Sequence, residues 1–334
     1  MIILGILASS MKGLLQSIAV AHATSPFVSA YSWSAGFGAK YADPATLPTG
    51  TGHSVAFTPS GSDIAVSHTT TPFVSAYPWN NNFGTKYADA ATLVGSTGRS
   101  VTFSPSGTTI ALASFGSAYI HAYPWSAGFG TKYSNPATLP TGNGFGIAFQ
   151  PNGAAVAVAH GTSPYVSAYP FSSGFGTKYA NPATLPTSDG SSVSWSPSGS
   201  DIALANALTP FVTTYTWTSG FGTKYANPAT LPGTESFAVA FNPAGNAIVI
   251  GHATSPFVAA YPWSAGFGTK YANPATLPAG VGNALSFKAD GTVLALANDN
   301  SPFVTAYDFS SGFGTKYANP ATLPTGQGRG VDFI

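Results

Sequence analysis

Four histidines at one position of an internal repeat are the side chains best suited to chemistry. The seven residues at that position, in chain order, are His22, His68, Ser114, His160, Asn206, His252 and Asn298. Imidazole is the commonest protein ligand for metal ions. Because serine and asparagine replace histidine freely within one chain, however, we expect hydrogen-bonding residues at the end of a strand, and neither a metal nor a cofactor.

Catalysis by paired carboxylates or by a Ser/His/Asp set needs a group of residues that occurs once in the molecule. Comparison of the seven repeats shows no such set that is unique to one of them. Aspartate and glutamate together number only ten, too few for a calcium site that gathers several carboxylates. The Gly-Phe-Gly element in each repeat is followed by no helical pattern, so it indicates a turn and not a nucleotide-binding loop. The sequence therefore favours a protein that is not an enzyme and has no catalytic residue.

Seven lysines recur at one position of the repeat and account for most of the basic residues. They are Lys40, Lys86, Lys132, Lys178, Lys224, Lys270 and Lys316. A sevenfold anion site is one interpretation. We favour the other, in which lysine on the outer, unpaired edge of each sheet discourages edge-to-edge association.

Most of the differences between repeats fall in two kinds of loop that would share one face of the molecule. The varied residues are His53, Arg99, Phe145, Asp189, Glu235, Asn283 and Arg329 in one kind of loop, and Phe115, Leu208 and Asp299 in the other. Varied loops on a uniform scaffold are where recognition is usually placed. They are therefore the candidate ligand face, although neutral drift in exposed loops explains the same pattern.

These residues are positioned by a segment that occurs seven times, Gly-Phe-Gly-Thr-Lys-Tyr-Ala-Asn-Pro-Ala-Thr-Leu-Pro, intact at residues 174–186. Its phenylalanine recurs every 46 residues from Phe37 to Phe313, without insertion or deletion. A fixed period of this length is typical of solenoids and propellers. In the second copy, alternating apolar residues between Pro/Gly turns predict strands at 54–57, 63–68, 73–79 and 83–87. We therefore predict an all-β, seven-bladed β-propeller of four-stranded blades.

Composition restricts the function classes. Only 6% of residues are charged and the formal net charge is +1, which argues against nucleic-acid binding, since that requires several phosphates to be neutralised. No apolar run reaches the length of a membrane-spanning helix. There is no cysteine, so disulfides and thiolate metal sites are excluded.

The repeat unit also resembles a known class. Phe-Ser-Pro-Ser-Gly at 103–107, Ile-Ala-Leu at 110–112 and Tyr-Pro-Trp at 123–125 resemble the first three strands of a blade in WD-repeat and YVTN-type propellers. The resemblance covers residues 13–334. The Gly-His and Trp-Asp dipeptides of true WD repeats are missing, so their hydrogen-bonded tetrad is not implied.

The two ends of the chain predict how the ring closes. Val331 and Phe333 continue the pattern of the first strand, whereas Ser9 and Met11 do not, so we expect the C-terminal strand to complete the blade that begins near Leu15. Residues 1–12 then form a separate apolar arm, and residues 13–334 the propeller. The candidate docking residues of the arm are Met1, Ile2, Ile3, Leu4, Ile6 and Leu7.

The arm resembles the opening of a class of marine bacteriophage virion proteins that are tail-fibre-like or knob-like. That resemblance implies a structural or display protein, docked through its arm to another virion protein, with the propeller outward as a spacer, decoration or host-adhesion module. Such a protein would be located in the virion and could bind a host surface glycan or protein. The alternative is a secreted, lectin-like propeller with several glycan sites. Both of these are non-enzymatic, and a third class, an enzyme such as a propeller lactonase or glycosidase, is the least favoured.

Overall fold

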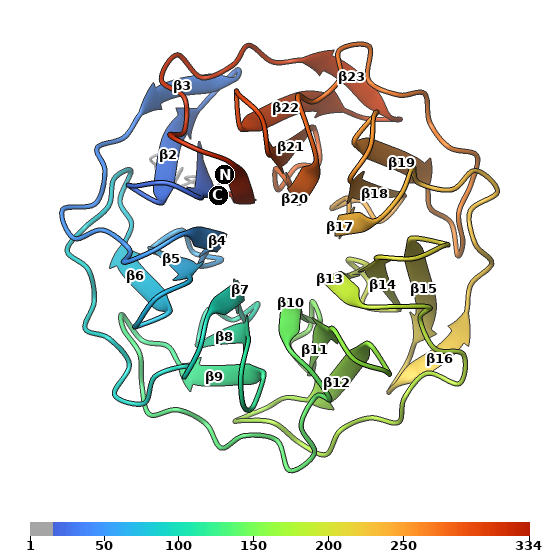
Figure 1. The fold of residues 1–334 in the computed structure, drawn as a ribbon, viewed down its shortest axis with the longest axis horizontal. Coiled ribbons are helices and arrows are strands. Elements are labelled where there is room, and N and C mark those ends of the chain that lie inside the picture. The colour runs from blue at the N-terminus through green and yellow to red at the C-terminus, as the bar shows by residue number, and fades with distance from the viewer. Residues whose placement is uncertain (1–15) are drawn as a thin grey trace, which may run out of the picture.

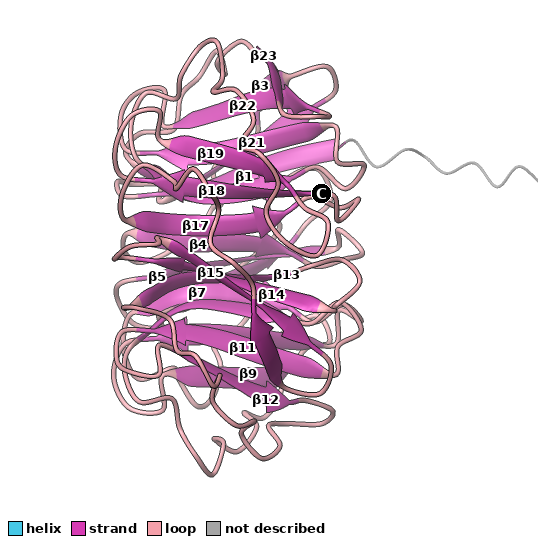
Figure 2. Ribbon diagram, turned by 90° about the vertical axis from the view of Figure 1, so that its right-hand side faces the viewer, coloured by secondary structure: helices cyan, strands magenta, loops and turns pink. Residues whose placement is uncertain are grey.

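The computed structural model describes residues 16–334, and the predicted arm at residues 1–12 lies outside them. The described residues form 24 strands and no helix. The strands make seven antiparallel sheets arranged in a ring (Figure 1). The innermost strands of the sheets surround the axis of this ring, which is called the channel below. Seen from the side, the molecule is a disc whose loops emerge from its two faces (Figure 2). The prediction of an all-β, seven-bladed propeller is confirmed.

Each blade runs from an innermost strand at the channel to its outer edge. The innermost strands of blades 1 to 7, in this order, are β24 (Gly328–Phe333), β4 (Gly52–Phe57), β7 (Gly98–Phe103), β10 (Gly144–Phe149), β13 (Gly190–Trp195), β17 (Ser236–Phe241) and β20 (Gly282–Phe287). The second strands are β1 (Gln16–His22), β5 (Asp63–His68), β8 (Thr109–Ser114), β11 (Ala155–His160), β14 (Asp201–Asn206), β18 (Ala247–His252) and β21 (Val293–Asn298). The third strands are β2 (Val28–Trp33), β6 (Val74–Pro78), β9 (Ile120–Pro124), β12 (Val166–Pro170), β15 (Val212–Trp217), β19 (Val258–Pro262) and β22 (Val304–Phe309).

A fourth strand is present only in blades 1, 5 and 7, as β3 (Phe37–Lys40), β16 (Phe221–Lys224) and β23 (Phe313–Lys316). In the other four blades the predicted outer strand is reduced to one isolated bridge, such as Trp79↔Phe83. The cause is a single position at the end of the third strand. Four blades have proline there, and three have Ser32, Thr216 or Asp308. Proline lacks the N–H that a further ladder bond requires, so the outer strand does not form beside it.

The last strand of the chain stands in the same sheet as the first described strand. β24 pairs antiparallel with β1, with Val331 opposite Val20 and Phe333 opposite Ile18. Both Val331 and Phe333 are buried in the core of this blade. The C-terminal strand therefore occupies the place that its apolar pattern predicts.

The core lies between neighbouring blades, and aromatic side chains join them. In blade 2, Trp79 meets Phe57 and Phe83 of its own blade edge-to-face at 5.2 and 5.1 Å, and Tyr41 of blade 1 at 5.3 Å. The hydroxyl of Tyr77 donates a 2.8 Å hydrogen bond to the Thr46 carbonyl, also from the segment that follows blade 1. This repeated arrangement fixes the spacing of the blades, and so fixes the ring of innermost strands that surrounds the channel.

Candidate ligand site at the mouth of the channel

Every innermost strand contains a β-bulge at the same place. In β4, for example, Gly52 pairs with His68 and Ser54 with Ser67, which leaves His53 as the extra residue. The same shift occurs in the other six blades. The seven bulge residues, from blade 1 to blade 7, are Arg329, His53, Arg99, Phe145, Ser191, Phe237 and Asn283. A bulge redirects a side chain out of the regular alternation of the sheet.

All seven bulge residues line one cavity of about 400 Å³ at the mouth of the channel. Asp189 and Glu235, which stand two residues before the bulge position in blades 5 and 6, line it too. The volume is in the range of sites for small molecules. The cavity is thus built where the seven strands meet, and every blade supplies at least one side chain to its wall.

The rarest charged residues of the chain are concentrated in this cavity. Arg99 and Arg329 are the only two arginines, and Glu235 is the only glutamate. The repeat is otherwise poor in charge and nearly uniform, so these three residues distinguish the cavity from the rest of the chain.

Blades 1 to 3 supply a basic arc made of Arg329, His53 and Arg99. Arg99 Nη1 lies 3.1 Å from Nδ1 of His53 and donates to the neutral ring. Burial, together with the charges of Arg99 and Arg329, lowers the pKa of His53 to about 3. Burial and the charge of Arg329 lower the pKa of Arg99 to about 10. At neutral pH the arc therefore holds two arginine charges and an uncharged histidine.

Two phenylalanine rings also contact the guanidinium group of Arg99. Its guanidinium carbon lies 5.2 Å from the ring centroid of Phe115 and 5.7 Å from that of Phe145. The two rings meet edge-to-face at 5.3 Å. These are cation–π distances, so Arg99 is confined between aromatic faces and the histidine.

The opposite part of the rim is acidic and polar. Asp189 and Glu235 are exposed and precede the innermost strands of blades 5 and 6. In blade 7, Asn283 Nδ2 donates to Asp299 Oδ1 at 2.6 Å and to the Gly328 carbonyl at 2.8 Å. Two carboxylates thus stand across the ring from the two arginines.

The predicted ligand-face residues divide into three groups. Seven of them line the cavity, namely His53, Arg99, Phe145, Asp189, Glu235, Asn283 and Arg329. Phe115 and Asp299 do not line it but contact Arg99 and Asn283, which do. Leu208 is 61% exposed and lies outside the cavity wall.

The sequence interpretation missed Ser191 and Phe237. It compared residues from two positions of the repeat, because Asp189 and Glu235 stand two residues before the equivalents of His53. A strict 46-residue alignment from His53 would have found both residues. The rarity of arginine and glutamate in the chain would have indicated Arg99, Arg329 and Glu235 as residues of the cavity wall.

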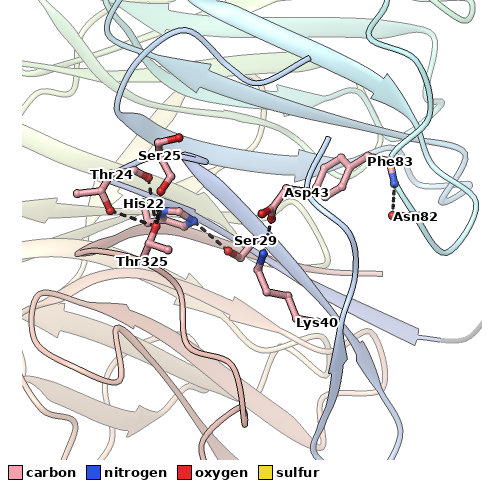
Figure 3. A network of polar contacts seen from close by, with 9 residues as sticks. All are labelled: His22, Thr24, Ser25, Ser29, Lys40, Asp43, Asn82, Phe83 and Thr325. Atoms are coloured by element: carbon pink, nitrogen blue, oxygen red, sulfur yellow. Dashed lines mark hydrogen bonds and ion pairs between the residues drawn. The ribbon is translucent and has the colours of Figure 1, made fainter. Parts of the chain in front are cut away.

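Three of the four repeated histidines hydrogen-bond a serine of the third strand. His252 is the exception, because both of its ring nitrogens are buried without a hydrogen-bond partner. His22 Nε2 lies 3.0 Å from Ser29 Oγ, and its Nδ1 lies 3.4 Å from Thr325 Oγ1, which donates to the Ser25 carbonyl at 2.7 Å (Figure 3). His68 and His160 bond Ser75 and Ser167 in the same way. Within residues 16–334 no group of three or more His, Asp or Glu side chains is arranged to hold a metal ion.

The seven lysines are not free cations on the rim. Each Nζ donates to the Asp or Asn side chain three residues later, from Lys40–Asp43 to Lys316–Asn319. The side chains of Lys40 and Lys86 are only 15% and 13% exposed. Their role in preventing edge association stays a prediction, and in four blades the edge they would protect is not a regular strand.

No protein-family model matches this sequence, and no curated protein matches it. Solved structures do match in fold. A candidate 6-phosphogluconolactonase from Bacteroides fragilis has a TM-score of 0.75 at 12% identity, with 97% of this chain and 99% of that chain covered. Another from Bacteroides uniformis and a periplasmic gluconolactonase from Pseudomonas aeruginosa each have a TM-score of 0.68 at 13% identity, covering 96% of this chain and 99% of theirs.

These comparisons overturn the functional expectation drawn from the sequence. Proteins that share this propeller over nearly their whole length are named as lactonases, which are enzymes. The prediction of a non-enzymatic virion protein, with the lectin-like alternative, is therefore wrong. It relied on the apolar residues 1–12, which lie outside the described part of the chain, and on the absence of a unique constellation. The varied residues that line the cavity come from seven strands that are distant in sequence. No helix in residues 16–334 is long and apolar enough to cross a membrane.

Proposed function

We propose that the chain is a hydrolase for small, polar cyclic esters of the sugar-lactone type, and that the cavity at the channel mouth is its active site. The observation that carries the proposal is that both arginines and the only glutamate of the chain line one cavity. The names of the similar structures, which are lactonases, suggest the reaction class.

The basic arc is suited to the oxygen-rich side of such a substrate. Among the described residues neither arginine forms an ion pair, and the Nε atoms of Arg99 and Arg329 are buried without a hydrogen-bond partner. Guanidinium groups stabilise negative charge that develops on a carbonyl oxygen. The arginines would therefore hold the ester carbonyl and stabilise the oxyanion that forms when water attacks.

The carboxylates opposite are suited to activating that water. Asp189 or Glu235 would accept a proton from water as the oxygen bonds to the carbonyl carbon. The bond between the carbonyl carbon and the ring oxygen then breaks, and the ring oxygen takes a proton to become a hydroxyl. His53 is a poor candidate for this base, because its pKa is about 3 and it accepts a hydrogen bond from Arg99.

Hydrolysis of D-glucono-1,5-lactone, followed as proton release in a pH-stat, tests the proposal. We expect the wild-type chain to exceed the spontaneous rate, and R99Q, R329Q and one of the two variants D189N and E235Q each to lose about a hundredfold in kcat/KM, the scale for removing one stabilising group. K178Q on the outer rim is the matched control. If the wild-type chain accelerates neither this lactone nor its 6-phosphate or its 1,4-isomer, the proposal fails.

A further inference from the structure

One loop position lies beside the start of the innermost strand of its blade. It is the first residue after the second strand, and from blade 1 to blade 7 it is Ala23, Thr69, Phe115, Gly161, Ala207, Ala253 and Asp299. In blade 4 this position is close to the bulge residue, since a Cβ built on Gly161 would lie 3.0 Å from the ring of Phe145. Four blades have alanine or glycine here, whereas blades 2, 3 and 7 have Thr69, Phe115 and Asp299.

Two of these residues contact a polar bulge residue of the cavity. Phe115 lies under the Arg99 guanidinium at 5.2 Å, and Asp299 accepts a hydrogen bond from the Asn283 amide at 2.6 Å. Each pair lies within a single blade. Phe115 is the only aromatic residue at this loop position and Asp299 the only charged one, so blades 3 and 7 differ from the others in what they place against the bulge residue.

We propose that Phe115 and Asp299 are positioning residues of the cavity, Phe115 for Arg99 and Asp299 for Asn283, an inference that rests on the proposed active site. Neither residue lines the cavity, so both would act through the residue that they hold. This assigns to the loops of blades 3 and 7 a function that the corresponding loops of the other blades do not have.

Phe115 confines a side chain that would otherwise have many rotamers. Arginine loses considerable conformational entropy when it is fixed, and the faces of Phe115 and Phe145 favour one placement of the guanidinium. The bond to His53 restricts it further. Arg99 is thus prepared before the substrate arrives, which lowers the cost of binding the transition state.

Asp299 determines which end of the Asn283 amide faces a ligand. An ionised carboxylate only accepts hydrogen bonds, so Nδ2 of Asn283 turns to Asp299 and to the Gly328 carbonyl. The carbonyl Oδ1 is left as the atom for a ligand. Asn283 would then recognise a substrate hydroxyl, which makes the Asn283–Asp299 pair a determinant of specificity for hydroxylated substrates.

The presence of only two arginines gives a direct test that does not depend on activity. Protein labelled with 15N-arginine should show two Nε–H signals, one for each of Arg99 and Arg329. In F115L we expect the Arg99 signal to lose its ring-current shift and to exchange about tenfold faster with water, while the Arg329 signal stays in place. F115Y should restore the wild-type signal. An Arg99 signal that is unchanged in F115L overturns the role of Phe115.

Kinetics with D-glucono-1,5-lactone provide the second test. F115L should lower kcat by about tenfold, the scale of one cation–π contact, with F115Y near wild type. D299A, which removes the acceptor, should raise KM more for this lactone than for δ-valerolactone, which has no hydroxyl groups. T69A, at the same position of blade 2, is the matched control. Equal effects of D299A on the two lactones overturn the role of Asp299. A wild-type chain without lactonase activity, but with the expected shift in F115L, refutes the proposed function and supports the positioning of Arg99.

Discussion

Trp33 and Phe333 pack edge-to-face with their ring centroids 5.1 Å apart, although one lies in the third strand of blade 1 and the other in the last strand of the chain. Trp33 also meets Tyr317 of blade 7 at 5.1 Å. One indole therefore joins the first described blade to both the C-terminal strand and the preceding blade.

Removing the Phe333 side chain from this contact should destabilise the propeller. We expect F333A to lower the free energy of unfolding by about 3–5 kcal/mol, the cost of removing a buried phenylalanine ring. Deleting residues 330–334 should cost more, because the edge of β1 that pairs with β24 also becomes unpaired. Denaturant unfolding monitored by tryptophan fluorescence measures both. A truncated chain that unfolds at the same denaturant concentration would contradict this account.

The buried histidines should make the protein sensitive to acid. Burial lowers the pKa of His160 to about 4, and of His22, His68 and His252 likewise. A folded-state pKa below the unfolded value of about 6.5 means that the unfolded chain binds the proton more readily. Stability is therefore complete above pH 6.5 and is lost as the pH falls toward 4, by about 3 kcal/mol for each such histidine.

The substitution H160N tests this assignment with a residue that the chain already uses, since Asn298 occupies the same position and bonds Thr305 at 3.2 Å. We expect a melting temperature near that of the wild type at pH 7.5 and a smaller decrease between pH 6.5 and 4. An unchanged decrease would show that the pKa of His160 is the same in the folded and unfolded states.

Asp332 should have the opposite effect to the histidines on the pH dependence of stability. Its carboxylate faces the region where the innermost strands meet, accepting from the Phe57 amide at 2.9 Å and from Ser286 Oγ at 3.1 Å. Burial is the main cause that raises its pKa to about 6, while these hydrogen bonds lower it. A folded pKa above the unfolded value means that stability is lost as the pH rises from about 4 to 6.

We therefore expect D332N to flatten this part of the pH dependence and to stabilise the protein at pH 7 by about 1–2 kcal/mol, less than the full shift implies because the side chain is only partly buried. Thermal melts at pH 4.5 and pH 7 provide the comparison. Equal destabilisation by D332N at both pH values would mean that the hydrogen bonds matter more than the burial of charge.

The proline position should control the fourth strand. T216P is expected to remove β16 from blade 5, since the pairing of Tyr215 with Lys224 lies beside it. P124T should allow blade 3 to form the strand that it lacks. Hydrogen exchange of residues 221–224 and 129–132 reports the two changes, with faster exchange expected in T216P and slower exchange in P124T. Unchanged exchange in both would place the cause elsewhere.

Much of the fold could be predicted because the same pattern of strands and turns recurs seven times in the sequence. The second strand was placed with its observed bounds at residues 63–68, and the role of Val331 and Phe333 followed from the period. The fourth strand was predicted in every blade and is regular in three, because the effect of Pro78 and its equivalents on the outer edge was not weighed. The function was predicted wrongly, since the apolar N-terminal residues were given more weight than the two arginines.

The sequence by itself determined the number of blades, their order and the apolar faces that pack between them, because these depend on a period and an alternation that can be read locally. Only the tertiary structure decided where the varied residues lie relative to one another. A bulge shifts one residue per innermost strand out of the ladder and turns it toward the channel, and closure of the ring brings Arg329 of the last strand beside His53 of blade 2. Neither event has a local pattern, because each depends on strands that are far apart in the chain.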